Sequence, residues 1–441
     1  MKIVHLLGWY FPDSVGGTEV YVEALCKRLQ AAGHEVLIAA PDPHRTAPAQ
    51  YEYGGVPVFR YPISDQPTRD EAYHRVAMPG AAHLFRWLAQ ERPDILHVHS
   101  IKSGSGLPEF REAHRLGIRI IATCHLPSLG YLCRTGELMQ DGKRPCDGIV
   151  WPSKCAACSL THVGFPSLAS RIAGAIPPPL GTVLRVLPGN VGTVLGMSAL
   201  VVEYQNMQRE LFDMVERFVV LNDIAYRMLV ADGSPASKIA INRLGLSQNG
   251  VVRKPGPDVQ PTRKPVRFGF AGRLHPAKGL LTIARAVQMI PREIDFRIDI
   301  RAPALDDATR ALAAELRRVV GDDPRVRFEP AVPSADIPAV LTELDALLSP
   351  SLWFENGPTI ALEAFAVGTP VIASRVGNPT ELIDDGVTGR LVKPGDAAEL
   401  AAALLEAATS PETTIDVWRR SLPPVRTMDD VTRDYETLYA A

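Results

Sequence analysis

The chain contains 441 residues, and its 47 basic and 49 acidic residues leave a formal net charge of −2. Hydrophobic residues make up 46% and charged residues 22%, a balance typical of globular proteins. This composition excludes a disordered chain, a collagen-like repeat and a coiled coil, and the near-neutral charge gives no support for nucleic-acid binding. An anionic ligand must therefore be recognised by local geometry rather than by a basic surface.

The first apolar run, Ile3–Leu7, is followed at once by Gly8 and Pro12. It is too short for the apolar region of a secretory signal peptide, and no stretch approaches the about 18 apolar residues of a membrane-spanning helix. We therefore expect a soluble, cytoplasmic protein. In that compartment its six cysteines are expected to be thiols or metal ligands rather than disulfides.

The N-terminal half is predicted to be an α/β domain. Lys2–Leu7 has the pattern of a short buried strand, and Thr18–Ala32 carries apolar residues at helical spacing with Gly33 suited to end the helix. His34–Ala40 is predicted to be the next strand. Because strands and helices continue to alternate, we expect a mostly parallel, doubly wound sheet. Its later strands are expected at Asp94–His99, Ile118–Thr123 and Arg217–Leu221.

Two features of this half are candidates for ligand contact. Gly16 and Gly17 join the first strand to the first helix, where glycine permits positive φ and a close approach of ligand to backbone. Glu19 is expected to stabilise the helix dipole rather than to act in catalysis. His125 follows a predicted strand and is expected to face the ligand site, with a purely structural role as the alternative.

Four cysteines fall within one short window. Cys133, Cys146, Cys155 and Cys158 are separated by 12, 8 and 2 residues, and the last pair has the spacing that lets two thiolates share one tetrahedral ion. A structural zinc site is the preferred interpretation. Free thiols, a regulatory disulfide or an iron–sulfur cluster are the alternatives. Cys26 and Cys124 are expected to be buried and structural.

The stretch 165–214 is rich in leucine, valine, glycine and proline. It is interpreted as helices that cover the first sheet, in preference to an amphipathic surface that touches a membrane and serves a lipid-linked acceptor. The second interpretation would make the protein peripheral at the inner face of the membrane.

A second α/β series follows a proline-rich stretch after Asn249-Gly250, which is predicted to be a linker. The chain is therefore divided into a Rossmann-like domain (1–248) with a cysteine-rich insertion (about 126–215), a second Rossmann-like domain (249–424) and a final helix (425–441) that packs back on the first. Two such sheets are expected to bind ligands at the carboxyl ends of their strands. The predicted strands of the second domain are Val266–Ala271, Phe296–Ile300, Val326–Phe328, Ala346–Ser349 and Val371–Ala373, with helices at Thr282–Met289 and Pro358–Val367.

The turn after Val266–Ala271 carries two cations. Arg273 can form paired hydrogen bonds with phosphate oxygens, and Lys278 can supply a point charge. Two solvated surface cations are the alternative. Their place at the carboxyl end of a strand favours the phosphate-binding interpretation.

The segment Glu355–Glu363 is the most informative of the sequence. Pro358 suits the first position of a helix and Gly357 its cap, so the amides of Thr359 and Ile360 are expected to favour an anion. The flanking carboxylates can each accept hydrogen bonds from vicinal sugar hydroxyls. Ordinary solvated glutamates are the alternative.

Taken together, these motifs resemble the family 4 glycosyltransferases, retaining enzymes of the GT-B fold. The resemblance spans most of the chain, and the paired glutamates with the downstream helix are its most specific part. The matching segments are Gly16-Gly17, Gly33-His34-Glu35-Val36, Gly272-Arg273, Lys278-Gly279, Glu355–Glu363 and Gly368–Ser374.

The resemblance implies a nucleotide-diphosphate-sugar donor and a glycan, lipid-linked or small-molecule acceptor hydroxyl. No catalytic divalent ion is expected, because two cations take its place at the leaving diphosphate. The implied roles are diphosphate binding by Arg273 and Lys278, ribose binding by Glu363, sugar binding by Glu355, Asn356 and Gly357, further donor contacts by Gly16, Gly17, Pro358 and Thr359, and approach to the sugar by His125. Glu355, His125, Arg273 and Lys278 form the implied catalytic set.

The sequence departs from the family pattern at two places. Leu126 follows the histidine where an acidic residue is frequent, and Gly377-Asn378 stands where a double glycine is frequent. These departures affect sugar recognition rather than the chemistry. A catalytically silent sugar-nucleotide-binding protein and another GT-B activity, such as sugar-nucleotide epimerisation, are the competing hypotheses.

Overall fold

The structure is a computed structural model that describes residues 1–13, 16–247, 262, 264–303 and 306–441. It divides into two compact units. Unit 1 comprises Met1–Gly142, Cys146–Ser247 and Thr427–Ala441, and unit 2 comprises Gln248–Arg426 with Lys143–Pro145. Most of the stretch expected to be a linker, 248–261 and 263, lies outside the described residues.

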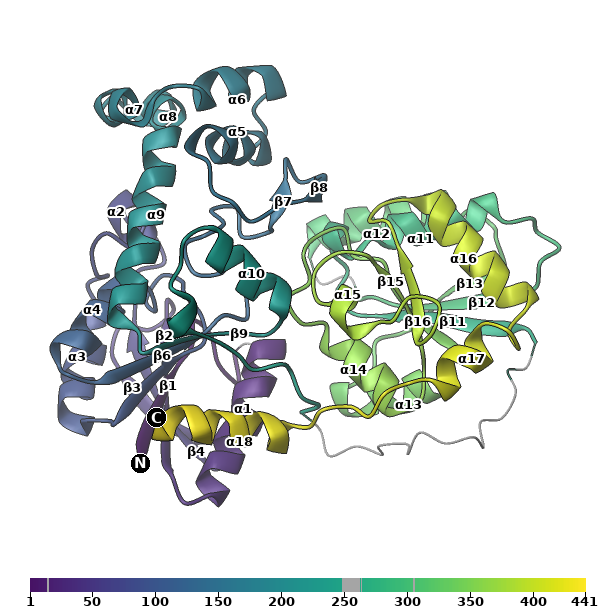
Figure 1. Cartoon of the computed structure of the whole chain (residues 1–441), viewed down its shortest axis with the longest axis horizontal. Helices are drawn as coiled ribbons and strands as arrows, with labels where there is room; N and C mark the ends of the chain where they lie inside the picture. The colour runs from purple at the N-terminus through teal and green to yellow at the C-terminus, as the bar shows by residue number, and fades with distance from the viewer. Residues whose placement is uncertain (14–15, 248–261, 263, 304–305) are drawn as a thin grey trace. The chain divides into compact units, whose positions relative to one another are not determined.

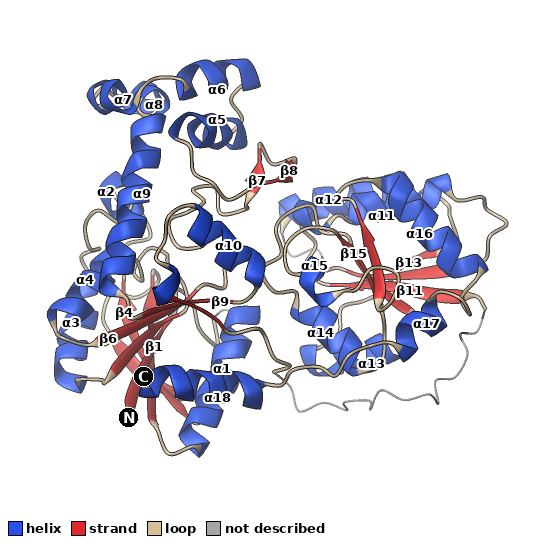
Figure 2. Ribbon diagram, viewed as in Figure 1, coloured by secondary structure: helices blue, strands red, loops and turns tan. Residues whose placement is uncertain are grey.

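Unit 1 is built on an eight-stranded sheet in the order β10-β9-β6-β5-β1-β2-β4-β3 (Figure 2). All neighbouring strands are parallel except β3, which runs antiparallel to β4 at one edge. The strands are β1 (Lys2–Leu6), β2 (Glu35–Asp42), β3 (Ala49–Tyr53), β4 (Val56–Pro62), β5 (Ile95–Val98), β6 (Arg119–Thr123), β9 (Arg217–Val220) and β10 (Ile239–Ile241).

The sheet of unit 1 is accompanied by helices in the expected alternation, because the crossover between two parallel strands needs one. They are α1 (Gly17–Ala31), α2 (Arg69–Ala72), α3 (Ala81–Glu91), α4 (Leu107–Arg115), α10 (Asp223–Ala231) and α18 (Met428–Ala440). Two strands of two residues each, β7 (Met139–Gln140) and β8 (Arg144–Pro145), lie in the cysteine-rich loop.

The C-terminal helix α18 belongs to unit 1. Leu246 and Thr427 form a parallel bridge at its start, and α18 packs on α1. Tyr435 of α18 is buried, and its hydroxyl accepts a hydrogen bond from Tyr21 at 3.2 Å. The last helix therefore completes the fold of the unit in which the chain begins.

The insertion between β6 and β9 differs from the sequence-based expectation. Its helices were expected to cover the first sheet, but α5, α6, α7 and α8 pack mainly on one another and on α9 (Figure 1). The reason is a small core of their own, in which Ala156 and Leu160 of α5 meet Ala173 of α6 and Leu200 of α9. The helices are α5 (Pro152–His162), α6 (Ser167–Gly174), α7 (Pro178–Leu184), α8 (Gly189–Leu195) and α9 (Met197–Met214).

Unit 2 is built on a six-stranded, wholly parallel sheet in the order β13-β12-β11-β14-β15-β16. The strands are β11 (Val266–Ala271), β12 (Phe296–Arg301), β13 (Val326–Phe328), β14 (Ala346–Ser349), β15 (Val371–Ser374) and β16 (Gly389–Val392). The helices are α11 (Leu280–Met289), α12 (Asp307–Val320), α13 (Ile337–Thr342), α14 (Thr359–Ala366), α15 (Pro379–Leu382), α16 (Ala397–Thr409) and α17 (Ile415–Arg420).

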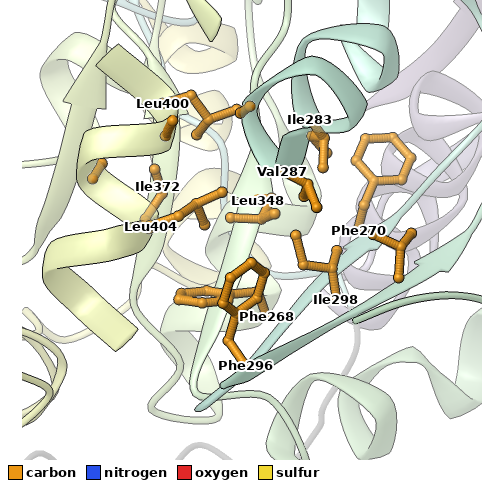
Figure 3. Packing of buried hydrophobic residues seen from close by; sticks show 14 of the residues in the cluster. Phe268, Phe270, Ile283, Val287, Phe296, Ile298, Leu348, Ile372, Leu400 and Leu404 are labelled. Carbon is orange, nitrogen blue, oxygen red and sulfur yellow. The ribbon is translucent and has the colours of Figure 1, made fainter. Parts of the chain in front are cut away.

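One core of unit 2 lies between the central strands and the helix pair α11 and α16, and a second cluster packs α13 and α14 against β14 and β15. Figure 3 shows Phe268 and Ile298 of the sheet close to Val287 of α11, with Leu400 and Leu404 of α16 nearby. Side chains on both faces of a parallel sheet are buried, so its strands are continuous apolar runs. The α/β, Rossmann-like fold class predicted from the sequence is confirmed in both units.

Candidate functional site

The loop after β14 carries Glu355, whose carboxylate oxygen Oε1 accepts three hydrogen bonds. Lys278 Nζ donates at 2.6 Å, Ser351 Oγ at 2.6 Å and Trp353 Nε1 at 3.1 Å. Lys278 ends the 3₁₀ helix Pro276–Lys278, which follows β11, the neighbour of β14 in the sheet. The structure thus brings together Lys278 and Glu355, two residues that the sequence assigned to one site.

The two loops that supply this ion pair are locked to each other by their backbones. Leu352 N donates to Ala277 O at 2.7 Å. Gly279 has a φ of 74°, and a Cβ added there would lie 1.9 Å from the carbonyl oxygen of Pro350. Glycine is needed at this position both for the positive φ and for the close approach. The distance between Lys278 and Glu355 is therefore set by the fold.

The backbone of Glu355 is held from a third segment. Asn378 N donates to Glu355 O at 2.7 Å, and Glu355 pairs with Gly377 in a short parallel bridge. Gly377 has a φ of 70°, and an added Cβ would lie 2.4 Å from Glu355 O. A single glycine at this position is sufficient for the close packing, although a double glycine is frequent here in the family.

The two glutamates lie in different electrostatic environments. Burial alone would raise the pKa of Glu355, but the charge of Lys278 and the hydrogen bonds from Lys278, Ser351 and Trp353 outweigh it and lower the pKa below its usual value. Burial raises the pKa of Glu363, which lies on α14. Glu355 is thus a fixed, ionised acceptor, whereas the charge of Glu363 is more weakly stabilised.

The helix that follows Glu355 begins one residue later than predicted. Pro358 is the N-cap, with an extended ψ of 94°, and α14 starts at Thr359, so Gly357 precedes the cap rather than forming it. The first amides of a helix have no partner within it, and its dipole favours an anion there. The amides of Thr359 and Ile360 keep the role expected from the sequence.

The second predicted cation is placed differently from the first. Arg273 lies in the loop after β11 and is exposed, whereas Lys278 is half-buried against Trp353, with its Nζ 5.9 Å from the ring centroid. The His275 ring also stacks on Trp353, with the two ring centroids 5.3 Å apart. Arg273 is therefore free to reorient toward a ligand, while Lys278 is already positioned.

In unit 1, Gly16 and Gly17 do not adopt the positive φ that glycine permits, and Gly16 matters because it has no side chain. Gly16 is the N-cap of α1 with an extended φ of −139°, and Gly17 is the first helical residue. Neither glycine has a positive φ, in contrast to the expectation. A Cβ at Gly16 would lie 2.6 Å from a carboxylate oxygen of Glu19, so glycine leaves room for that buried side chain.

His125, which is half-buried, is the last member of a chain of imidazoles whose other members, His5 and His99, are buried. Its Nε2 lies 3.1 Å from His99 Nδ1, and His99 Nε2 lies 2.9 Å from His5 Nδ1. The edge of Tyr21 meets the His125 ring at 4.8 Å between centroids. Burial lowers the pKa of His125 and of His5 to about 3, so both rings are neutral near pH 7.

A fourth histidine ties this chain to the C-terminal helix. His97 Nδ1 lies 2.7 Å from the Tyr439 hydroxyl of α18, and its Nε2 lies 2.7 Å from Thr123 Oγ1. Nitrogen atoms of His5, His97 and His99 lie within 4.8 Å of one another, a spacing compatible with a metal ion. Because hydrogen bonds already engage both nitrogens of His97 and of His99, we assign the cluster to a hydrogen-bond network.

Sequence reasoning missed several of these groups. Ser351 and Trp353 lie in the segment that carried the strongest signal, but nothing in their spacing shows that both donate to Glu355. His97 and His99 alternate at the end of a predicted strand, which places them on one face of the sheet, and this was a usable signal. The contact between His99 and His5 joins residues 94 positions apart, and it can be predicted only when the order of the strands in the sheet is known.

The four predicted metal ligands lie around one cavity of unit 1, which has a volume of about 40 Å³. Cys155 and Cys158 are one turn apart on α5, while Cys133 and Cys146 lie in the preceding loop. Cys26 and Cys124 are buried as expected.

Two family models match the chain. The model described as "Glycosyltransferase Family 4" matches residues 15–174, and the model described as "Glycosyl transferases group 1" matches residues 265–410. The first match includes Gly16, Gly17, His125 and the cysteines, and the second includes Lys278 and both glutamates. The matched ranges therefore contain every residue that the sequence assigned to donor binding, catalysis or metal binding.

Curated relatives are similar over part of their length. The amylovoran biosynthesis glycosyltransferase AmsK of Erwinia amylovora is 29% identical over 56% of this chain and 60% of its own. A D-inositol 3-phosphate glycosyltransferase of Corynebacterium kroppenstedtii is 36% identical over 31% of each chain. The chain thus spans less than two thirds of these relatives.

Solved structures resemble the chain over its whole length. A sucrose-phosphate synthase from Thermosynechococcus elongatus aligns with a TM-score of 0.66 and 17% identity, covering 100% of this chain and 98% of its own. The Anabaena protein HepE, solved in complex with UDP-glucose, aligns with a TM-score of 0.62 and 15% identity over 100% of both chains. At this identity the likeness establishes the fold.

Proposed function

Since the chain belongs to glycosyltransferase family 4, we propose that it transfers a sugar from a nucleotide-diphosphate-sugar donor to an acceptor hydroxyl, with retention of the anomeric configuration. The observation that carries this proposal is the Lys278–Glu355 pair at the carboxyl ends of β11 and β14, beside the start of α14. Cation, carboxylate and free amides are the groups that a sugar diphosphate requires.

The geometry of the pair suggests which group of the donor each of the two residues binds. The ammonium group of Lys278 has three donors, so it can keep its bond to Glu355 and still donate to a phosphate oxygen. The three hydrogen bonds to Glu355 described above all go to Oε1, and Oε2 is the oxygen that we assign to a sugar hydroxyl. Glu363 on α14 is assigned to the ribose.

The chemistry follows from charge rather than from a dedicated base. In a front-face displacement the departing phosphate oxygen accepts the proton of the acceptor hydroxyl. Arg273, Lys278 and the amides of Thr359 and Ile360 stabilise the negative charge that develops on that oxygen, which is the largest catalytic contribution we invoke. These cations supply the positive charge that a divalent ion supplies elsewhere. His125, held neutral, serves as a hydrogen-bonding group toward the sugar.

Donor binding and product stereochemistry test the proposal. Calorimetric titration with UDP-, GDP- and ADP-sugars should give one nucleotide that binds, and NMR of the product should show the donor's anomeric configuration. Lys278→Ala should weaken donor binding by at least about tenfold, because a charged contact is lost. The control is Lys393→Ala, an exposed lysine of the same unit.

Three results would contradict this assignment. Binding without turnover would favour a silent sugar-nucleotide-binding protein, and conversion of the donor sugar without transfer would favour an epimerase. Equal donor affinity in the Lys278 and Lys393 variants would remove Lys278 from the site.

The helical insertion supports a lipid-linked acceptor and a peripheral membrane contact. Leu168 and Ile172 of α6 and Val186 after α7 are 73%, 67% and 80% exposed. These three side chains, here called the apolar patch, are exposed on one helical insertion, and exposed apolar side chains of this kind favour an interaction site. No acidic residue occurs between Asp147 and Glu203, so helices α5 to α8 carry no negative side chain that would repel anionic headgroups. None of the described helices is both long and apolar enough to cross a bilayer, so we assign contact with its surface.

Vesicle flotation tests this contact. The full chain should float with anionic phospholipid vesicles, and Leu168→Ser/Ile172→Ser/Val186→Ser should lose most of that binding while donor affinity is unchanged. The control, Met289→Ser/Val387→Ser, removes exposed apolar side chains of unit 2. Unchanged flotation of the insertion variant, or association of the chain with itself through this patch, would overturn the membrane assignment.

A further inference from the structure

The cysteine-rich loop of unit 1 folds around a small cavity that four thiols share. Cys133, Cys146, Cys155 and Cys158 all line it, and none forms a disulfide. Cys155 and Cys158 lie on the same side of α5, because residues three apart face one direction on a helix. A cavity of about 40 Å³ has room for one ion or for about two or three water molecules.

The backbone of this loop points donors at sulfur. Leu138 N donates to Cys133 Sγ at 3.4 Å, and Asp141 N donates to Cys158 Sγ at 3.3 Å. Hydrogen bonds to an ionised acceptor are the stronger kind, so an N–H group aimed at sulfur offsets part of the cost of holding a thiolate in a buried place. Such bonds also orient metal ligands from outside the coordination sphere.

A positive charge stands next to the same sulfur atoms. Lys154 lies on α5 between Cys146 and Cys155, and its charge acts on both thiols. Its Nζ is fixed by Asp147 Oδ1 at 2.7 Å and by Ile149 O at 2.5 Å. Four thiolates around a divalent cation carry a net charge of −2, which a neighbouring ammonium group partly offsets.

We propose that Cys133, Cys146, Cys155 and Cys158 bind one structural Zn²⁺ ion in tetrahedral geometry. Four thiols release four protons as the four zinc–sulfur bonds form, so the charges balance. Zinc–sulfur bonds of about 2.3 Å place tetrahedral sulfur atoms about 3.8 Å apart. Among the residues that the structure describes, no three of these sulfur atoms lie within 4.8 Å of one another. Binding therefore draws the loop 133–148 inward onto α5.

This site has a function distinct from sugar transfer. The loop 133–148 has only two-residue strands and no helix, so it has few backbone interactions of its own. Zinc would tie it to α5, the first helix of the insertion that carries the exposed apolar patch. The ion would thus fix the base of that insertion, and none of its four ligands belongs to unit 2, which carries the Lys278–Glu355 pair.

Elemental analysis of the full chain tests the site directly. We expect about one zinc per chain after purification without chelator, and Cys155→Ser/Cys158→Ser should reduce this to background. Cys26→Ser is the matched control, because this buried cysteine of α1 lies outside the cavity and should leave the zinc content unchanged. Replacement of zinc by Co²⁺ in the wild-type chain should give the absorption of a tetrahedral thiolate complex, a readout that needs no variant.

Several outcomes would overturn the proposal. Bound iron together with the visible absorption of an iron–sulfur cluster would assign the cysteines to such a cluster. Loss of alkylatable thiols under non-reducing conditions would assign them to disulfides. A third outcome is a metal-free protein that keeps four alkylatable thiols and yet has a loop 133–148 that resists proteolysis to the same degree as in the zinc-supplemented protein. That result would show that no ion is needed. Donor binding should persist after zinc removal, so failure here is distinguishable from failure of the proposed transfer activity.

Discussion

At the scale of single residues, the buried imidazoles of unit 1 give the chain a defined response to acid. His5, His97 and His99 are fully buried, and desolvation lowers the pKa of each, as it does for His125. In the unfolded chain these groups regain a pKa near 6.5, so unfolding takes up protons below that pH. The stability that unit 1 derives from neutral histidine is therefore present above pH 6.5 and is lost as the pH falls toward about 3.

We predict that the melting temperature of unit 1 falls more steeply than that of unit 2 between pH 7 and pH 5. Each buried histidine can remove up to about 1.4 kcal/mol per pH unit below 6.5. Unit 2 is an internal control, since its only histidine is the exposed His275. Scanning calorimetry at a series of pH values measures both transitions. Parallel decline of the two transitions would contradict the prediction.

The residue scale is also where sequence reasoning was least complete. The Lys278–Glu355 pair was predicted as two members of one site because each follows a strand of the same parallel sheet. Their direct contact was not predicted, since it depends on β11 and β14 being neighbours, and these strands are separated in the chain by β12 and β13. Hydrogen bonds between side chains from different strands can be predicted only when the order and register of the strands in the sheet are known.

At the scale of elements, the strands were predicted well where apolar runs end sharply. The bounds of β11, β13 and β14 match the prediction; β11 and β14 are largely buried runs, and charged residues flank β13 on both sides. The β3–β4 hairpin was missed, because alternate residues of β3 are exposed and its apolar pattern is weak. The Gly54-Gly55 turn between these strands is a hairpin signal that was available in the sequence.

Among the elements of the site, the turn at Gly279 has the least tolerance for change. We predict that Gly279→Ala destabilises unit 2 by about 3 kcal/mol and weakens donor binding, because the new Cβ would force Pro350 and its loop away. Gly386→Ala is the control in the same unit. It also has a positive φ, of 81°, but the nearest atom to an added Cβ lies 3.9 Å away, so only the backbone cost of about 1 kcal/mol is expected. Denaturant unfolding and donor titration check both values, and equal effects would refute the role of the close contact.

At the scale of the whole molecule, α18 connects the last residues of the chain to the sheet that contains the first. Tyr435 and Tyr439 are buried and bond to Thr123 and His97 of that sheet. We predict that a chain ending at residue 426 loses the calorimetric transition of unit 1 and keeps that of unit 2. Tyr439→Phe should cost only about 1 kcal/mol, because it removes one buried hydrogen bond without opening a cavity. Retention of both transitions after truncation would show that α18 is dispensable.

The domain division was accessible from the sequence because two alternating series of strands and helices are separated by a proline-rich stretch. The arrangement of α5–α8 was not, because an apolar helix has the same pattern whether it meets a sheet or its neighbours. Ten of the large apolar side chains that are exposed in the described residues lie between Trp151 and Val191. Composition alone cannot show which apolar residues remain uncovered.

The return of α18 to unit 1 also sets an order of events during synthesis. Every residue of unit 2 leaves the ribosome before α18 does, so that unit can mature while its older neighbour still lacks a helix. Until α18 has emerged, His97 of β5 and Thr123 of β6 lack their tyrosine partners, and the side of α1 that packs on α18 stays uncovered. A nascent chain that stalls between unit 2 and α18 is therefore half mature, and its unfinished part is the N-terminal one, which makes it a natural client for chaperones.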